Sequence, residues 1–268
     1  MAVAQAQTEI RPQQPPPALS VGVMGLYIFL ASEVMFFGTL FAAYAYLVGS
    51  HGQWPPAFPA GSQPVPVWPL PTINTFVLIS SGVTCHFGLE ALRHGRRLGT
   101  AGIVAGALLV GFVVADVVCA IVAAVGGASA FEVSLAVFGA LVQLVCAGIA
   151  LGLGPFTSGR AVFFGLWIGT IILGAAFEAG QIYEFLTAGI GLTTNIFTSA
   201  FFTMTGFHGL HVAGGLVLLL LILGRALRGQ FSSRHHVGPA AITLYWHFVD
   251  VVWIFLWSIL YFFVAFAR

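Results

Sequence analysis

Long apolar runs constrain what this chain can fold into more than any other feature. We count seven of them, each long enough to cross a bilayer as a helix, which takes about 20 residues. Charged residues make up only 6% of the chain, against about 25% in ordinary soluble domains. The runs show no period-2 alternation, so helices rather than barrel strands satisfy the backbone. We therefore predict an all-α membrane protein with seven transmembrane helices.

A proline-rich loop, Gly49 to Pro71, follows the first predicted span, the later connections are shorter, and no repeat of fixed period is evident. They cover about residues 21–48, 72–92, 99–125, 130–153, 161–188, 196–223 and 240–267. Residues 1–20 are rich in Gln, Pro and Ala, and we predict a disordered tail there. Residues 21–268 are then a single transmembrane helical domain.

The arginines predict the orientation of the chain in its membrane. Eight of them fall at one end of the predicted bundle: Arg11, Arg93, Arg96, Arg97, Arg160, Arg225, Arg228 and Arg234. Loops rich in Arg and Lys stay in the cytoplasm, so this end is predicted to be cytoplasmic. An odd number of spans places the N-terminus inside and the C-terminus outside. The net charge of +1 offers no basic surface for nucleic acid.

The last span carries two polar residues deep in an apolar run. His247 and Asp250 are three positions apart, so they share one helix face. A carboxylate at bilayer depth costs about 2.5–3.5 kcal/mol on insertion scales. One interpretation is a hydrogen-bonded pair that locks helices together; the other is a proton path or a ligand site. Either way, this face is predicted to meet protein rather than lipid.

Other ionisable residues stand within the spans. Glu33 lies near the middle of the first span, as a structural hydrogen-bonding group or as a proton carrier. His208 and His211 have a spacing that could hold a metal together with Glu178 or Glu184. We favour the interpretation without metal, in which these groups form a polar seam between helices, and no residue is catalytic. The predicted seam consists of Glu178, Glu184, His208, His211 and His247.

A cationic cluster stands between the last two spans. Its members are Arg225, Arg228, His235 and His236. Such a cluster can bind the phosphate groups of lipids, although it is also the ordinary signature of a cytoplasmic loop. We predict phospholipid binding here.

At these residues the chain resembles subunit III of the haem-copper terminal oxidases, the cytochrome c oxidase and quinol oxidase family. Seven short stretches carry the resemblance, in the order of the family. They are ASEVMFF at 31–37, WPP at 54–56 with PTINT at 71–75 and SSGVT at 80–84, QIYE at 181–184, TGFHGLHV at 205–212, and YWHFVDVVW at 245–253.

The resemblance implies a subunit without redox centres of its own, in a bacterial inner membrane. Haem and copper would lie in the partner subunits I and II of a proton-pumping oxidase that reduces O2 to water in aerobic electron transport. This subunit would stabilise the catalytic subunit, support proton uptake and bind phospholipid. Glu33 would match the buried carboxylate of the family, and His247 with Asp250 its final-helix pair.

Two departures from the family pattern stand out. Long members begin with two further helices that this chain lacks. Residues 99–154 instead read as an inserted helix pair with Asp116 in its first helix. Two alternatives stay open: an accessory subunit of a quinol oxidase or nitric-oxide reductase of the same family, and a standalone proton-coupled transporter that uses Glu33, Asp116 and Asp250.

Overall fold

The structure, a computed structural model, describes residues 21–58, 66, 68–95, 98–156 and 158–266. Within these residues, seven helices are each long and apolar enough to cross a membrane. They are α1 (Val21–Ser50), α2 (Leu70–His94), α3 (Thr100–Val125), α4 (Ala130–Ala150), α5 (Gly159–Thr187), α6 (Ile196–Leu227) and α7 (Val237–Trp257). The predicted fold class, all-α with seven spans, is confirmed. The predicted tail lies outside the described residues.

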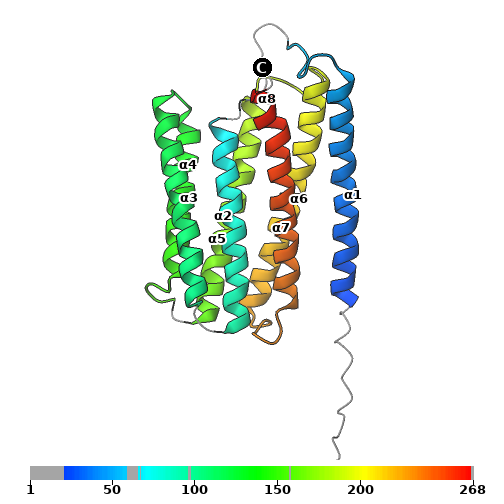
Figure 1. Cartoon of the computed structure of the whole chain (residues 1–268). Coiled ribbons are helices and arrows are strands. Elements are labelled where there is room, and N and C mark those ends of the chain that lie inside the picture. Colours follow the sequence, from blue (N-terminus) through cyan, green and yellow to red (C-terminus); the bar gives the residue numbers. More distant parts are fainter. Residues whose placement is uncertain (1–20, 59–65, 67, 96–97, 157, 267–268) are drawn as a thin grey trace, which may run out of the picture.

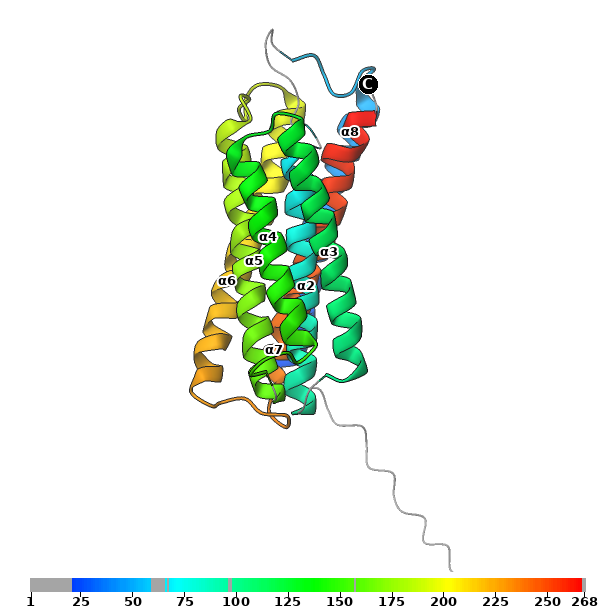
Figure 2. The same cartoon turned by 90° about the vertical axis from the view of Figure 1, so that its left-hand side faces the viewer.

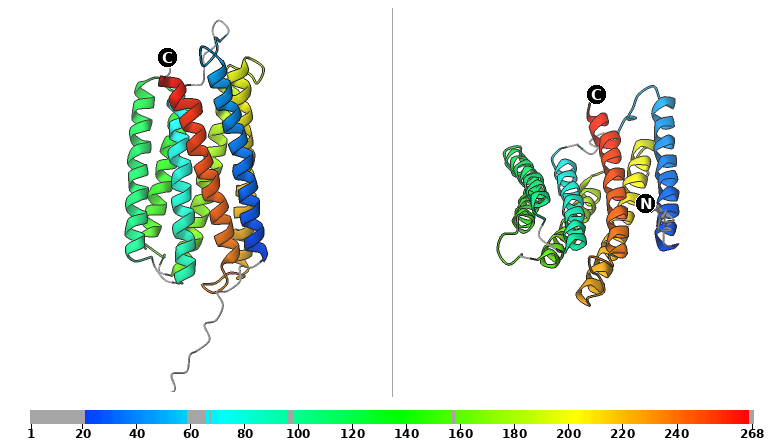
Figure 3. Two further views of the ribbon diagram at one scale, coloured as in Figure 1. Left: turned by 45° about the vertical axis from the view of Figure 1, so that its right-hand side comes forward. Right: turned by 60° about the horizontal axis from the view of Figure 1, so that its bottom comes forward.

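The helices stand side by side as antiparallel pairs, with α1 alone at one edge (Figure 1, Figure 3). The α3–α4 pair forms the opposite edge and faces the viewer in Figure 2. Between these edges lie α2 with α5 and then α7 with α6; the α2–α5 contact is the most extensive. In the most apolar window of α2, 67% of the residues are buried, against 6% for α1. Thus α2 forms the centre of the bundle, whereas α1 rests on its surface.

Local sequence signals mark where several helices begin. At the start of α4, the Ser129 hydroxyl accepts from the Glu132 backbone N–H at 3.3 Å, and Glu132 accepts from the Ser129 N–H at 2.7 Å. Asn195 and Thr198 form the equivalent reciprocal cap at the start of α6. These caps satisfy backbone donors that have no partner inside the helix.

The last span does not end as a regular α-helix. After α7 the chain continues through a π-helical segment, η1 (Ser258–Phe262), and a short helix, α8 (Phe263–Phe266). Together these elements occupy the predicted seventh span, but the sequence pattern did not predict the π-helical segment. It carries Tyr261, which is fully buried.

The described arginines gather at one end of the bundle. The end of α2, the start of α5, and the connection from α6 to α7 all lie at the lower end in Figure 1. Arg93, Arg160, Arg225, Arg228 and Arg234 belong to these segments. Arg160 Nη2 donates to the carbonyl of Ala226 at 3.3 Å, which joins the start of α5 to the end of α6. Arg11, Arg96 and Arg97 lie outside the described residues, and the cytoplasmic orientation stays a prediction.

Trp246 of α7 anchors the centre of the bundle. Its indole is fully buried and lies against Gly174 of α5 and Gly215 of α6. A Cβ at either glycine would come within 2.7 Å of the indole ring, so only glycine permits this close approach. The indole Nε1 donates to Ser81 Oγ of α2 at 3.0 Å. One side chain thus contacts three neighbouring helices.

Candidate functional site

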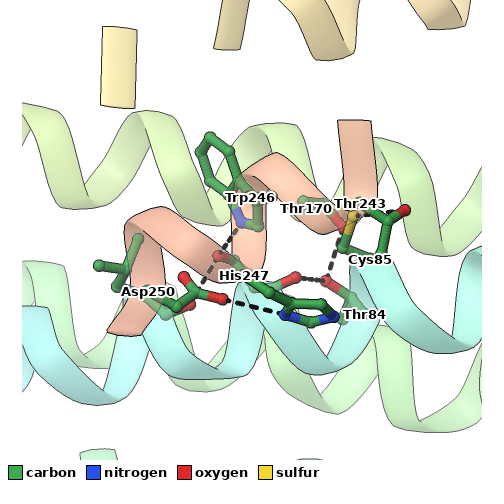
Figure 4. Close-up of polar contacts among 9 residues, drawn as sticks. Thr84, Cys85, Thr170, Thr243, Trp246, His247 and Asp250 are labelled. Atoms are coloured by element: carbon green, nitrogen blue, oxygen red, sulfur yellow. Dashed lines mark hydrogen bonds and ion pairs between the residues drawn. The ribbon is translucent and has the colours of Figure 1, made fainter. Parts of the chain in front are cut away.

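The inner face of α7 is joined to α2 by three hydrogen bonds along its length, and Figure 4 shows those made by Trp246 and Thr243. They are Trp246 Nε1 to Ser81 Oγ at 3.0 Å, Trp253 Nε1 to Thr75 Oγ1 at 3.0 Å, and Cys85 Sγ to Thr243 Oγ1 at 3.4 Å. A further contact between the Thr84 and Thr170 hydroxyls, at 2.8 Å, joins α2 to α5. Hydrogen bonds between helices hold such bundles together where lipid supplies no hydrophobic drive.

His247 and Asp250 lie at the edge of this contact, on the same face of α7 as predicted. His247 Nδ1 is 3.5 Å from Asp250 Oδ2. The Asp250 carboxylate is buried directly over Gly82 of α2, where a Cβ would overlap Oδ2. The His247 side chain is 37% exposed. Asp250 therefore meets protein, as predicted, whereas His247 is only half covered by the chain itself.

A groove of about 410 Å³ opens beside this pair, between α2 and α7. Its lining residues are Ile79, Gly82, Val83, His86, Phe87, His247, Asp250 and Val251. The ring centroids of His86 and His247 are 5.9 Å apart. Asp250 Oδ1 is buried and has no hydrogen-bond partner among the described residues.

Glu33 of α1 pairs with His211 of α6. Glu33 Oε2 is 3.0 Å from His211 Nε2, and His211 Nδ1 is 2.7 Å from the carbonyl of Phe207. A carbonyl only accepts, so Nδ1 carries a proton, and a second proton lies between Nε2 and the carboxyl group. Tyr245 of α7 donates to the carbonyl of His211 at 3.0 Å. The pairing of Glu33 with His211 was not predicted, because 178 positions separate the two residues in the sequence.

Glu184 forms another buried polar contact, near the opposite end of the bundle from the arginines. Its Oε2 accepts from Gln181 Nε2 and from the Tyr261 hydroxyl, both at 2.9 Å. Tyr261 belongs to the π-helical segment, so this contact joins α5 to η1. Tyr261 was not among the predicted site residues, because a phenol within a long apolar run is the only feature that marks it in the sequence.

Among the residues that the structure describes, His208 and Glu178 find no hydrogen-bonding partner of this kind. The imidazole of His208 is fully buried, stacks on Trp253 at 5.1 Å between ring centroids, and meets the edge of Phe177. Neither of its nitrogens has a hydrogen-bond partner among the described residues. The carboxylate of Glu178 is partly buried beside Gly209 of α6.

The residues of the predicted seam are therefore distributed over separate contacts. His247 meets Asp250, His211 meets Glu33, Glu184 meets Tyr261, and His208 packs among aromatic rings. His208 and His211 point to different neighbours, and the structure does not join them with Glu184. In the part of the chain that the structure describes, no three His, Cys, Asp or Glu side chains stand close enough to hold a metal.

A polar contact in the α3–α4 pair escaped the sequence-based site prediction. Gln143 of α4 donates through Nε2 to Asp116 Oδ2 of α3 at 2.8 Å and to Ser80 Oγ of α2 at 3.0 Å. All three residues are fully buried. One sequence feature could have predicted this contact. Gln143 stands alone in an apolar run, and a side-chain amide at that depth needs a hydrogen-bonding partner.

The predicted lipid-binding residues lie at the end of α6 and in the connection to α7. Arg225 Nε donates to Gln230 Oε1 at 2.8 Å, and its guanidinium lies 5.3 Å from the centre of the Phe231 ring. Arg228 is the C-cap residue of α6, and His236 precedes α7. Arg228 and His235 are exposed, and His236 is partly buried.

Comparison with known proteins assigns the chain to a family. A family model described as "Cytochrome c oxidase subunit III" matches residues 17–153 and 158–265. The protein named cytochrome c oxidase subunit 3 of Thermostichus vulcanus is 36% identical over 240 residues, covering 89% of this chain and 86% of that protein. The protein of the same name from Synechocystis is 31% identical over 240 residues, covering 89% and 74%.

The likeness extends beyond cyanobacteria. The Mus musculus protein named cytochrome c oxidase subunit 3 is 31% identical over 242 residues, which is 88% of this chain and 67% of that protein. The family match includes residues 99–153, so it does not by itself identify the α3–α4 pair as an insertion. The resemblance stated from the motifs is confirmed: the chain belongs to the cytochrome c oxidase subunit III family.

Proposed function

We propose that this chain is a non-catalytic subunit III of a proton-pumping cytochrome c oxidase in a bacterial inner membrane. The family match carries this proposal. The geometry supports it, because polar side chains inside the bundle are engaged by neighbouring helices, as Trp246 is by Ser81, Glu33 by His211, and Glu184 by Tyr261. Such groups hold a helical scaffold together. Subunits I and II are the proposed partners, and they would carry the haem and copper.

The proposed role is to stabilise the catalytic subunit and to support its proton uptake. Glu33 and His211 are the residues we propose for a proton-related part in that role. Their side chains are 17% and 18% exposed, respectively, at the edge where α1 rests on α6. A neighbouring subunit could therefore exchange a proton with the pair without any rearrangement of the bundle.

We also propose that phospholipid binds at the end of α6. Arg225 is fixed through Nε by Gln230 and by the ring of Phe231, which leaves the other edge of the guanidinium for an anion. Arg228, His235 and His236 bring further donors to the same end of the bundle. Paired arginine donors match the oxygens of a phosphate group.

The decisive experiment is purification of the tagged chain in a mild detergent, with an optical spectrum and a list of the copurifying subunits. We expect haem absorbance and two larger partners. A partner with a two-copper domain would identify cytochrome c as the donor, whereas its absence from an intact, haem-bearing complex would favour a quinol oxidase or nitric-oxide reductase. A chain that purifies alone and moves protons in vesicles would instead be a transporter, which would contradict the proposal.

A second experiment tests the proposal that this chain is a non-catalytic subunit. The complex purified from cells that lack this chain should retain its haem spectrum and its initial rate of oxygen consumption, yet lose activity sooner during turnover. Loss of the haem spectrum would show that the chain takes part in holding the cofactor.

A further inference from the structure

The groove between α2 and α7 lies well inside the membrane. At 1.5 Å per residue, His86 is about 12 Å from the end of α2, and His247 is about 15 Å from the start of α7. The hydrocarbon core is about 30 Å thick, so the groove opens at a depth that lipid headgroups do not reach.

Polar atoms nevertheless border this groove. His86 is exposed, and His247 is 37% exposed. His247 faces Asp250 through Nδ1, so its other ring nitrogen, Nε2, is free to pair with a group outside the chain. Lipid tails offer no hydrogen bonds, so these atoms require a polar partner from outside the chain.

The shape of the groove fits a helix better than a small molecule. Its lining residues recur on successive turns of α2, at Ile79, Val83 and Phe87, and on two turns of α7, at His247 and Val251. A groove between two helices with a ladder of side chains on each wall receives the ridge of a third helix. The walls are otherwise apolar, as in packed membrane helices.

The outward faces of α3 and α4 differ from this groove. Their exposed side chains are aliphatic or aromatic, and include Ile103, Val114, Val118, Ile121, Leu141 and Leu144. Lipid tails alone can cover such apolar faces. The α2–α7 groove is therefore the better candidate for contact with another polypeptide.

We propose that this groove receives a transmembrane helix of another oxidase subunit, which presents a polar side chain to the imidazoles of His86 and His247 beside Asp250. The inference rests on the proposed function, since it requires that the chain belong to a complex. It adds which face of the chain meets the partner and what chemistry that partner offers.

Site-specific photo-crosslinking in the intact complex tests the proposal. A photoreactive amino acid replaces Val251, which is 50% exposed in the groove, or Val118 of α3, which is 52% exposed and serves as the matched control. We expect position 251 to crosslink to a transmembrane peptide of a copurifying subunit and position 118 to crosslink to lipid. Lipid alone at position 251, or an adduct with the mass of a lipid-soluble quinone, would overturn the proposal.

A substitution tests the hydrogen-bonding part. His86→Phe keeps an aromatic ring and removes the polar edge at an exposed position, so the fold is not at risk. We expect the fraction of the chain lost from the complex in a detergent challenge to rise roughly three- to tenfold, whereas Val118→Phe leaves it unchanged. Equal losses would contradict the proposal. Absence of haem-bearing partners from the unmodified preparation would refute the proposed function instead, so the two failures are distinguishable.

Discussion

Gly82 sets how closely α2 approaches the polar pair of α7. The Asp250 carboxylate occupies the space where a side chain at position 82 would lie, and a Cβ there would also come within 3.4 Å of His247 Nδ1. The buried carboxylate tolerates little displacement, because its contact with His247 at 3.5 Å depends on distance and angle. Glycine at position 82 therefore leaves the room that the Asp250 carboxylate needs beside His247.

We expect Gly82→Ala to destabilise the protein by about 1–3 kcal/mol, because the added methyl overpacks the contact and displaces Asp250. A lower thermal midpoint of the purified protein in detergent would show this. Gly111→Ala is the control: it lies in α3 with no atom within 4 Å of the added Cβ, so it should be neutral or stabilising by up to about 1 kcal/mol. Equal midpoints for the two variants would refute the close-contact argument.

Glu33 and His211 share a proton, and substitutions of Glu33 can test what that proton does. Glu33→Gln keeps a donor for His211 Nε2, so the α1–α6 contact should persist. Glu33→Ala removes it. We expect both variants to retain the haem content of the complex, and only Glu33→Ala to shorten the period of steady oxygen consumption. A turnover lifetime that Glu33→Gln shortens as much would instead show that the carboxyl group itself is needed.

Arg225 offers a test of the lipid proposal at a single side chain. We expect Arg225→Ala to release a phospholipid that copurifies with the unmodified protein, because the guanidinium that faces the phosphate is lost. Native mass spectrometry of the complex measures the bound lipid. Arg93→Ala removes a charge from the same end of the bundle and should leave that lipid in place. Unchanged lipid content in Arg225→Ala would end the proposal.

At the level of single helices, the length of an apolar run predicts well that a helix forms, but it predicts poorly which other helices that helix packs against. The seven spans were predictable because bilayer thickness fixes how many apolar residues a helix needs. The contact between Thr84 of α2 and Thr170 of α5 was not, since a helical Thr hydroxyl also lies within reach of its own backbone: Thr84 Oγ1 is 2.8 Å from the carbonyl of Ser81, and Thr170 Oγ1 is 3.0 Å from that of Leu166. The contact of Tyr261 with Glu184 depends on an irregular π-helical turn, for which an apolar run gives no signal.

The α3–α4 pair is fastened to α2 by Gln143. We expect Gln143→Leu to cost about 1–3 kcal/mol, since it leaves the buried carboxyl of Asp116 without its donor. The double variant Asp116→Leu with Gln143→Leu should recover most of that loss, because both polar partners are then removed. Thermal unfolding of the three proteins in one detergent measures this. A double variant less stable than Gln143→Leu would indicate that Asp116 has another essential contact.

For the whole molecule, the distribution of arginines predicts the orientation in the membrane. A reporter that is active only outside the cytoplasm should be active when fused after Arg268 and inactive when inserted after Gln230, between α6 and α7. The opposite result at both positions would reverse the orientation. Activity at both would contradict seven crossings.

The candidate site shows which contacts cannot be predicted from the spacing of residues along the chain. The pairing of His247 with Asp250 was predictable because both residues belong to one helix and are three positions apart. Their close contact with α2 was not predictable, because it depends on Gly82, which belongs to that other helix. Likewise, His208 and His211 look like one motif in the sequence, yet His208 packs against α5 and α7 whereas His211 contacts α1, and spacing along α6 does not say which helices surround it.

The α3–α4 pair begins and ends at the same end of the bundle, next to the close of α2 and the start of α5 (Figure 1). Adding or deleting both helices together therefore leaves the direction of every other segment unchanged, whereas losing one would invert α5, α6 and α7. This hairpin can be acquired or discarded by a lineage in a single genetic event. Variation in helix number among relatives should then come in steps of two.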